Sequence, residues 1–266
     1  MKLKITADNV FKFLTAVIAA SAAVILIISA YALITGSFEV LEKFGLDFFV
    51  GTKWNAAEGK AAFGVLPYVL GTIVTSGIAL IIGVPLSLGI AIFLSEMSPK
   101  ALSVPIGYIV ELLAAVPSVI YGLWGVFVFR YWLLDYVEIP LSTYLGWIPI
   151  FSGTPIGLDV FTAGIILAIM IIPTIASVSR DVIRSVPDSI REGAYSIGAT
   201  KWEVIRYWVL SYGRSGIFGA VILGLGRAVG ETMAVTMVIG NTTGPHAMPS
   251  SLFNPGQTLS SLIANG

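Results

Sequence analysis

The chain has 266 residues, of which 56% are hydrophobic and 11% are charged, whereas about a quarter of the residues of a soluble domain are charged. Zero cysteines and one histidine, His246, argue against disulfides and against metal centres built from thiolates or imidazoles. The net charge of zero does not identify a partner, and we expect no nucleic acid. The composition predicts an all-α, polytopic integral membrane protein in contact with membrane lipid.

Five apolar runs have about the 20 residues that a helix needs to cross a hydrocarbon core of roughly 30 Å. Backbone groups in lipid must pair within their own segment, so these runs are predicted to be helices. A soluble core could explain any one run, but five of this length argue against it. The first run lacks a signal-peptide cleavage site, and we expect it to be retained. The predicted spans are Phe13–Ile34, Pro67–Leu94, Ile106–Phe129, Val160–Ser177 and Gly216–Ile239.

The basic residues predict the orientation, because cytoplasmic loops carry more lysine and arginine. With the N-terminus inside, ten basic residues are cytoplasmic and four are external, and Arg227 lies inside a span. Five spans then place the C-terminus outside. Its last segment, NPGQTLSSLIANG, resembles the start of another element, and we expect a sixth span to be missing. The whole chain, residues 1–266, is predicted to be one domain.

Proline and aromatic residues mark irregular places in the spans. Pro85, Pro117 and Pro173 each free a carbonyl and favour a kink; kinked packing without a role in gating is the simpler account. Residues 130–159 are rich in Trp, Tyr and Pro, which favours a partly re-entrant or interfacial hairpin.

Residues 180–214, here named the charged loop, are too polar to enter lipid and are predicted to form two short helices. Gly198 is placed to end the first helix in the left-handed conformation. The predicted caps are Ser185 with Asp188 or Ser189 with Glu192 for the first helix, and Thr200 with Glu203 for the second. A projecting helix–turn–helix of this kind suits docking of a partner.

The sequence EGA at Glu192–Ala194, followed by Gly198 and Leu210, resembles the "EAA" loop of ABC importer permeases. The sequence departs from that pattern at Gly193, Trp208 and Ser211. The resemblance implies that the loop docks in a groove of a cytoplasmic ATPase through Glu192, Gly193, Ala194, Gly198 and Ala199. A helix lying on the inner leaflet is the alternative, with Trp202, Tyr207 and Trp208 as interface anchors.

Three further segments are similar to the PstC-type permeases of phosphate importers. They are IVELLAAVPSVIYGLWG from Ile109, TAGIILAIMIIPTIASVSRDV from Thr162 and GLGRAVGETMAVTMVIGN from Gly224. The resemblance implies the helical bundle of a type I ABC importer permease, in a prokaryotic cell membrane. It also implies four kinds of partner: a homologous PstA-like permease, two ATP-binding subunits, an extracytoplasmic phosphate-binding protein and inorganic phosphate.

The resemblance implies neither a catalytic residue nor a cofactor, and the chain has no Walker-type phosphate loop with which to hydrolyse ATP. A permease for another oxyanion, such as molybdate or sulfate, is the main alternative. An ion-coupled secondary transporter should show paired repeats, and none is visible. An intramembrane enzyme would need a nucleophile with a base, or metal ligands, and no span contains a histidine or cysteine.

Two charges in the last span are the candidate substrate pathway. Arg227 is expected about 18 Å along its helix from Ser215, near the bilayer midplane, where an ionisable residue is by default functional. On a continuous helix it shares one face with Glu231, at i, i+4 spacing.

The guanidinium of Arg227 suits an oxyanion, because it donates two parallel hydrogen bonds and stays charged. Glu231 would weaken the positive field and keep binding transient. The alternative is a self-neutralising ion pair between the two residues. For Glu111, the other acid in a span, snorkelling or capping is the simpler account.

Small residues flank this predicted charged face and would let neighbouring helices come close. The face itself is Gly219, Leu223, Arg227 and Glu231, with Ala220, Gly224 and Ala228 on one flank and Gly226 and Gly230 on the other.

Overall fold

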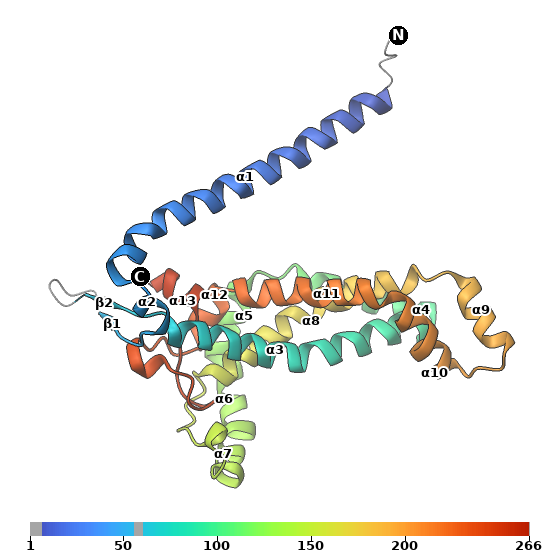
Figure 1. The fold of residues 1–266 in the computed structure, drawn as a ribbon. Coiled ribbons are helices and arrows are strands. Elements are labelled where there is room, and N and C mark those ends of the chain that lie inside the picture. Colours follow the sequence, from blue (N-terminus) through green and yellow to red (C-terminus); the bar gives the residue numbers. More distant parts are fainter. Residues whose placement is uncertain (1–6, 56–60, 266) are drawn as a thin grey trace, which may run out of the picture. The chain divides into compact units, whose positions relative to one another are not determined.

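The computed structural model describes residues 7–55 and 61–265 and shows a helical protein with one short hairpin (Figure 1). In the hairpin, β1 (Trp54–Asn55) pairs antiparallel with β2 (Ala62–Phe63). The helices are α1 (Ala7–Phe44), α2 (Asp47–Val50), α3 (Leu66–Ile92), α4 (Lys100–Ala114), α5 (Ser118–Trp124), α6 (Arg130–Leu133), α7 (Ile139–Leu145), α8 (Val160–Arg184), α9 (Asp188–Ser196), α10 (Lys201–Glu203), α11 (Leu210–Gly230), α12 (Met233–Val238) and α13 (Leu259–Asn265). π-Helical turns extend or join these helices at Phe93–Met97, Gly125–Phe129, Leu134–Glu138 and Val204–Val209.

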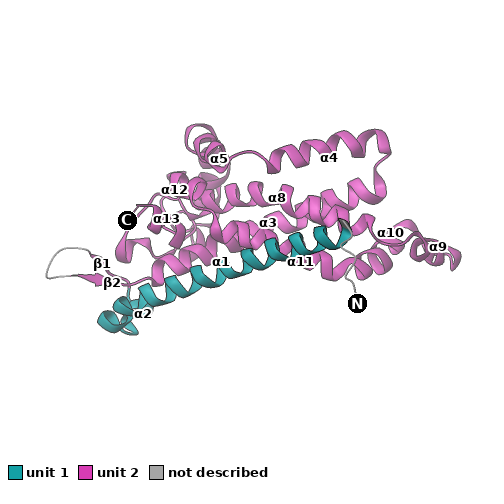
Figure 2. Ribbon diagram, turned by 90° about the horizontal axis from the view of Figure 1, so that it is seen from above, with its two compact units in different colours: residues 1–51 teal, residues 52–266 magenta. Residues whose placement is uncertain are grey.

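The chain forms two compact units, residues 1–51 and residues 52–266 (Figure 2). The first unit consists mainly of α1, a 38-residue helix whose apolar side chains are exposed almost throughout. Because a helix in lipid needs no polar face, uniform apolar exposure is what a membrane span requires. The predicted first span, Phe13–Ile34, lies wholly within this helix.

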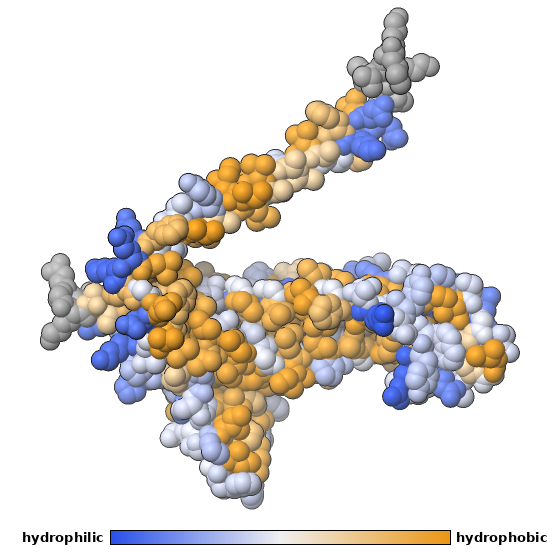
Figure 3. Space-filling model, viewed as in Figure 1, coloured by the Kyte–Doolittle hydropathy of each residue, from blue (hydrophilic) through white to orange (hydrophobic). Residues whose placement is uncertain are grey.

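In the second unit, α3, α8 and α11 lie side by side along one axis, and α9 and α10 lie at one end of it (Figure 1). α8 is the central helix, with 67% of its most apolar window buried, against 28% for the span that contains α3 and 22% for the span that contains α11. Apolar side chains cover much of the visible surface between the two ends (Figure 3). Such a surface favours lipid as the surrounding solvent.

Glycines let the helices approach α8 closely. A Cβ on Gly224 of α11 would lie 2.5 Å from Ile175 of α8, and a Cβ on Gly83 of α3 would lie 2.9 Å from Ile171. Both distances are shorter than a carbon–carbon contact allows. Small residues at these two positions therefore set the spacing of the three central helices, as the small flank of α11 predicted.

Among the described residues, four helical segments are long and apolar enough to cross a membrane: Asp8–Phe44, Leu66–Met97, Val160–Arg184 and Lys201–Gly230. A fifth pair, Lys100–Ala114 with Ser118–Leu145, passes the same test together but is bent by 88°. The predicted third span, Ile106–Phe129, is therefore not one straight helix. Its break includes Pro117, one of the three predicted kink sites, and Pro117 precedes α5 instead of interrupting it.

Candidate functional site

Arg227 and Glu231 lie on either side of a break in the last predicted span. α11 ends at Gly230, Glu231 is extended with φ −70° and ψ 124°, and α12 starts at Met233. The prediction that Gly216–Ile239 is one continuous helix is therefore wrong, and Glu231 does not share a helix face with Arg227. The side chain of Glu231 explains part of the break, because its Oε1 accepts a hydrogen bond from Ala234 N at 3.2 Å and so caps the first turn of α12.

Arg227 binds the central helix and not Glu231. Its Nη1 donates to Thr174 Oγ1 of α8 at 3.0 Å. Among the described residues, Arg227 forms no ion pair within 4.0 Å. The self-neutralising pair with Glu231 is thus not what the structure shows. A half-buried guanidinium without a carboxylate partner remains able to bind an anion.

The hydrogen bond to Thr174 places the guanidinium of Arg227 beside the middle of α8. Thr174 lies fourteen residues after Val160 and ten before Arg184, or about 21 Å and about 15 Å at 1.5 Å per residue. A helix of this length spans the hydrocarbon core with little excess. The sequence did not single out Thr174, although it directly follows the predicted kink residue Pro173.

The two flanks of α11 differ in their surroundings. Ala220, Gly224 and Ala228 are buried, and Gly224 packs on α8. A Cβ on Gly226 or Gly230 would meet nothing within 4 Å, and the same holds for Gly219. The flank formed by Ala220, Gly224 and Ala228 therefore packs within this chain, whereas the flank formed by Gly226 and Gly230 has free space for a neighbouring helix.

The charged loop forms one short helix as predicted, α9, but the prediction of a second short helix is wrong: α10 continues through the π-helical turn Val204–Val209 into α11, as the single helical segment Lys201–Gly230. Gly198 ends α9 with φ +86°, and Thr200 with Glu203 makes the predicted capping box; both predictions are confirmed. The predicted caps at Ser185 and Ser189 are wrong: α9 starts after Pro187 without a side-chain cap. Ser185 instead donates back to Val182 O of α8, the local bond that serine makes at a helix end.

The candidate docking residues of this loop are mostly accessible. Glu192, Gly193 and Gly198 are exposed, Ala199 is half-buried and Ala194 is buried beneath α9. Large side chains are also exposed around this turn, with Ile197 at 73%, Trp202 at 55% and Tyr207 at 58%. Beside Gly198, a hollow of about 390 Å³ is lined by Ile197, Gly198, Ala199, Glu203, Tyr207 and Trp208.

Comparison with known proteins explains this combination of spans and exposed loop. Residues 83–264 match the family described as "Binding-protein-dependent transport system inner membrane component". This chain belongs to that family. The permease is therefore a transporter component of the inner membrane and not an enzyme, and it works with other subunits of an ABC importer.

Curated relatives are similar over nearly the whole permease. The "Phosphate transport system permease protein PstC" of Haemophilus influenzae is 46% identical over 262 residues, which are 97% of this chain and 82% of the relative. The protein of the same name from Mesorhizobium japonicum is 48% identical over 240 residues, 89% of this chain and 72% of the relative. A solved structure, the MetNI methionine ABC transporter in inward-facing conformations, aligns with 18% identity and a TM-score of 0.46 over 68% of this chain and 74% of its own.

Two buried carboxyl groups of the permease join the segment after α6 to the start of α8. Glu138 and Asp159 are both 0% exposed. Thr162 Oγ1 donates to Glu138 Oε1 at 2.9 Å, and Thr162 N donates to Asp159 Oδ1 at 2.8 Å. Burial, together with the negative charge of Glu138, raises the pKa of Asp159 to about 8. No sequence pattern indicates this pair, because the two residues lie 21 positions apart and outside the quoted motifs.

A second in-span acid of the permease is also paired. Glu111 of α4 accepts a hydrogen bond from Arg180 of α8, with 2.5 Å between Oε1 and Nη2. Snorkelling or capping, the two accounts offered by the sequence, therefore do not describe Glu111. The pair ties α4 to the last turns of α8.

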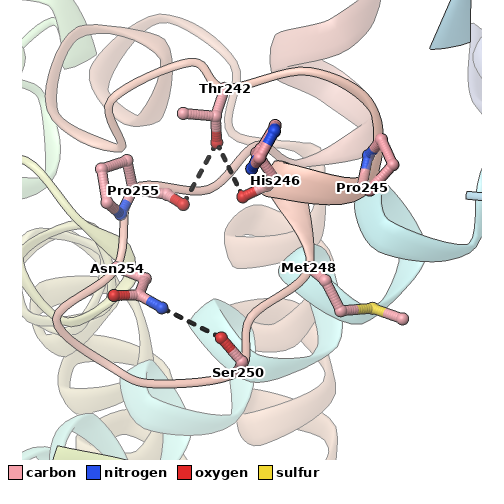
Figure 4. A pocket seen from close by; sticks show the side chains of 7 residues that line it. All are labelled: Thr242, Pro245, His246, Met248, Ser250, Asn254 and Pro255. Carbon is pink, nitrogen blue, oxygen red and sulfur yellow. Dashed lines mark hydrogen bonds between the residues drawn. The ribbon is translucent and has the colours of Figure 1, made fainter. Parts of the chain in front are cut away.

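The permease has a surface pocket of about 540 Å³ in the connection between α12 and α13 (Figure 4). Thr242 Oγ1 donates to Pro255 O at 3.1 Å, and Asn254 Nδ2 donates to Ser250 Oγ at 2.9 Å. These bonds fix the shape of the connection itself. Within the described residues, no group of three His, Cys, Asp or Glu side chains could hold a metal ion, so His246 in this pocket has no companion ligands.

Proposed function

We propose that this permease imports inorganic phosphate, driven by ATP, as one membrane subunit of a larger complex. The observation that carries the proposal is identity of 44–46% over 97% of the chain to relatives that are each named phosphate transport permease. The complex would contain a homologous PstA-like permease, two ATP-binding subunits and an extracytoplasmic phosphate-binding protein.

Arg227 and Glu231 would line the substrate pathway at the break between α11 and α12. Arg227 donates two parallel hydrogen bonds to a phosphate oxyanion, while Thr174 holds the guanidinium against α8. Irregular backbone in a span is tolerated where it lines a cavity, which supports a pathway at this break. Glu231 offsets the positive field, so that phosphate binds briefly and selectivity rests with the external binding protein.

The open flank of α11 would face the homologous permease. Gly219, Gly226 and Gly230 have free space beside them, and small residues let two membrane helices pack closely. Arg227 would then lie at the seam between the two permeases, where the pathway is shared.

The exposed end of the charged loop would dock on an ATPase subunit through Glu192, Gly193, Ala194, Gly198 and Ala199. α3 and α8 both end where this loop lies, and α11 starts there (Figure 1). α3 starts at the end of the second unit away from the charged loop, which would be the external side. Because α1 provides one membrane crossing before α3, the N-terminus would lie on the cytoplasmic side, together with the charged loop. The excess of basic residues in the same loop supports the same orientation.

Uptake by the complete complex in vesicles tests the function. With radiolabelled phosphate, sulfate and molybdate offered separately, we expect phosphate alone to enter, in a manner that needs both ATP and the binding protein. Entry of sulfate or molybdate without phosphate would instead assign the permease to another oxyanion. Uptake without the ATPase subunits would contradict an ATP-driven importer.

A further inference from the structure

Arg191, directly before the docking residue Glu192, has an acceptor for every N–H of its guanidinium. Nη2 donates to Glu96 Oε1 at 2.8 Å and to Ile183 O at 2.9 Å, and Nε donates to the same Glu96 oxygen at 3.3 Å. Nη1 donates to Asp188 Oδ1 at 3.2 Å and to Val186 O. Arginine has five N–H donors in a rigid planar fork and lysine has three on a point charge. The arrangement is therefore one that only arginine can complete.

The contacts of Arg191 are mostly withdrawn from solvent. Its side chain is 17% exposed and that of Glu96 is 12% exposed, whereas that of Asp188 is 87% exposed. An exposed ion pair contributes little, because water and salt screen it. The Glu96 contact is screened much less, and among the described residues it is the ion pair that joins Arg191 to a candidate membrane span, Leu66–Met97.

These bonds connect α9 to the ends of two central helices. Glu96 lies in the π-helical turn Phe93–Met97 that continues α3, while Ile183 is in the last turn of α8 and Val186 follows it. Arg191 donates to the carbonyl of Ile183, which also accepts from Val186 N, and to the carbonyl of Val186 just after the helix. An apolar cluster that includes Ile183, Val186 and Ala194 packs beside these bonds.

α8 continues from this contact to the candidate pathway. Thr174, the partner of Arg227, is nine residues before Ile183 in the same continuous helix, a distance of about 14 Å. A regular helix packed on both sides moves as a unit, so a displacement at its last turn reaches Thr174. α3, held by Glu96, packs along the same helix.

We propose that Arg191 is the positioning residue that transmits movement of α9 to α3 and α8, and through α8 to the substrate pathway. The proposal rests on the proposed docking of the charged loop to an ATPase. Arg191 itself touches neither substrate nor nucleotide. Its role is to make the docking helix and the two central helices move together.

The test compares phosphate uptake per ATP hydrolysed in vesicles containing the complete complex. We expect Arg191→Lys to assemble and to hydrolyse ATP while its uptake per ATP falls at least about fivefold, the lower end of usual coupling energies. Glu96→Gln keeps an acceptor oxygen but removes the charge, and its uptake per ATP should fall by a smaller factor. Arg214→Lys is the matched control, since Arg214 is an exposed arginine in the first turns of α11.

The ratio of phosphate uptake to ATP hydrolysis distinguishes a role in coupling from a role in the stability of the complex alone. If Arg191 only holds the loop together, uptake and hydrolysis fall in proportion to the complex recovered, the ratio stays at the wild-type value, and the proposal is overturned. If Arg191→Lys does not assemble, an unchanged ratio in Glu96→Gln overturns it equally. Wild-type complex that shows no phosphate-dependent uptake would contradict the proposed function itself, and this outcome is seen before any variant is compared.

Discussion

Arg227 of α11 donates a hydrogen bond to Thr174 of α8, 3.0 Å away, immediately after Pro173. Proline has no N–H, so the carbonyl one turn earlier in α8 loses its helical donor. A freed carbonyl, a hydroxyl and a guanidinium thus lie in neighbouring turns of two packed membrane helices. In an apolar environment such a group of polar atoms is costly, and the proposed role in substrate passage would account for it.

Removing the hydroxyl of Thr174 should impair transport without preventing assembly. Thr174→Val keeps the shape but leaves Arg227 without this acceptor, and a hydrogen bond to a charged group contributes about 1.5–3 kcal/mol. We expect phosphate uptake to fall by about 10-fold or more, while Thr174→Ser retains most of it. Uptake in vesicles, normalised to purified complex, is the measurement; equal uptake by the valine and serine variants would rule out this role.

Substituting Arg227 should abolish uptake whether or not Glu231 is also neutral. Arg227→Gln removes the cation. Because no ion pair joins the two residues, Glu231 loses no charged partner in this variant, and the complex should assemble. We expect uptake to fall by about 100-fold or more, the loss of an interaction of about 3 kcal/mol. The double change Arg227→Gln with Glu231→Gln should be equally inactive. Recovery of uptake in the double variant would show that the two charges serve only to neutralise each other.

Features decided by neighbouring residues could be predicted from the sequence. The apolar runs indicate the spans that contain α1, α3 and α8. The capping box at Thr200 and Glu203 follows from two residues three apart, and the left-handed turn follows from Gly198 between two helical patterns. Each depends on a stretch of chain too short for distant contacts to override.

Features decided by contacts between distant residues could not be predicted from the sequence. The break after Gly230 is invisible in hydropathy, because Met233–Val238 is as apolar as a continuing helix would be. It depends on Glu231, whose carboxylate caps the next helix and whose carbonyl accepts a bond from Ser260. Likewise the partners of Arg191 lie as much as 95 residues away in the chain, and no local pattern indicates them.

Orientation can be tested with single cysteines, because the chain has none of its own. Lys53, before β2, and Lys201, at the start of α10, are both exposed. In cells with an intact membrane, a thiol reagent that cannot cross it should label Lys53→Cys from outside and Lys201→Cys only after the membrane is opened. The reverse pattern would contradict the cytoplasmic N-terminus and the ATPase docking of the charged loop.

Replacing Gly198 should distort the docking turn through backbone strain alone. Its φ is +86°, and an added Cβ would meet no atom within 4 Å, so Gly198→Ala tests conformation and not crowding. The left-handed region costs a non-glycine residue about 1–2 kcal/mol, which corresponds to a fall in Tm of roughly 2–8 °C, with loss of phosphate-dependent ATP turnover. Gly89→Ala in α3 is the control, since its Cβ is equally free and its φ is helical; an equal effect of both changes would remove the argument from φ.

Stability should fall as the pH rises, because Asp159 holds its proton in the folded protein. Its pKa is raised from 3.8 to about 8 by burial and by Glu138. Between these values the folded state binds a proton that the unfolded state has released. The free energy of unfolding therefore decreases with increasing pH across this window. The contribution is fully present below pH 3.8 and is lost by about pH 8.

Asp159→Asn should flatten this dependence. Asparagine can still accept the hydrogen bond from Thr162 N that Asp159 accepts, but it does not titrate. Between pH 5 and pH 9 we expect the Tm of the purified permease to fall less in the variant than in the wild type, by about 2–4 °C for each kcal/mol that the proton on Asp159 contributes. Asp135→Asn, at an exposed position close to Glu138 in the chain, should leave the wild-type slope unchanged. Parallel curves for Asp159→Asn and the wild type would mean that Asp159 is ionised throughout this range in the folded protein.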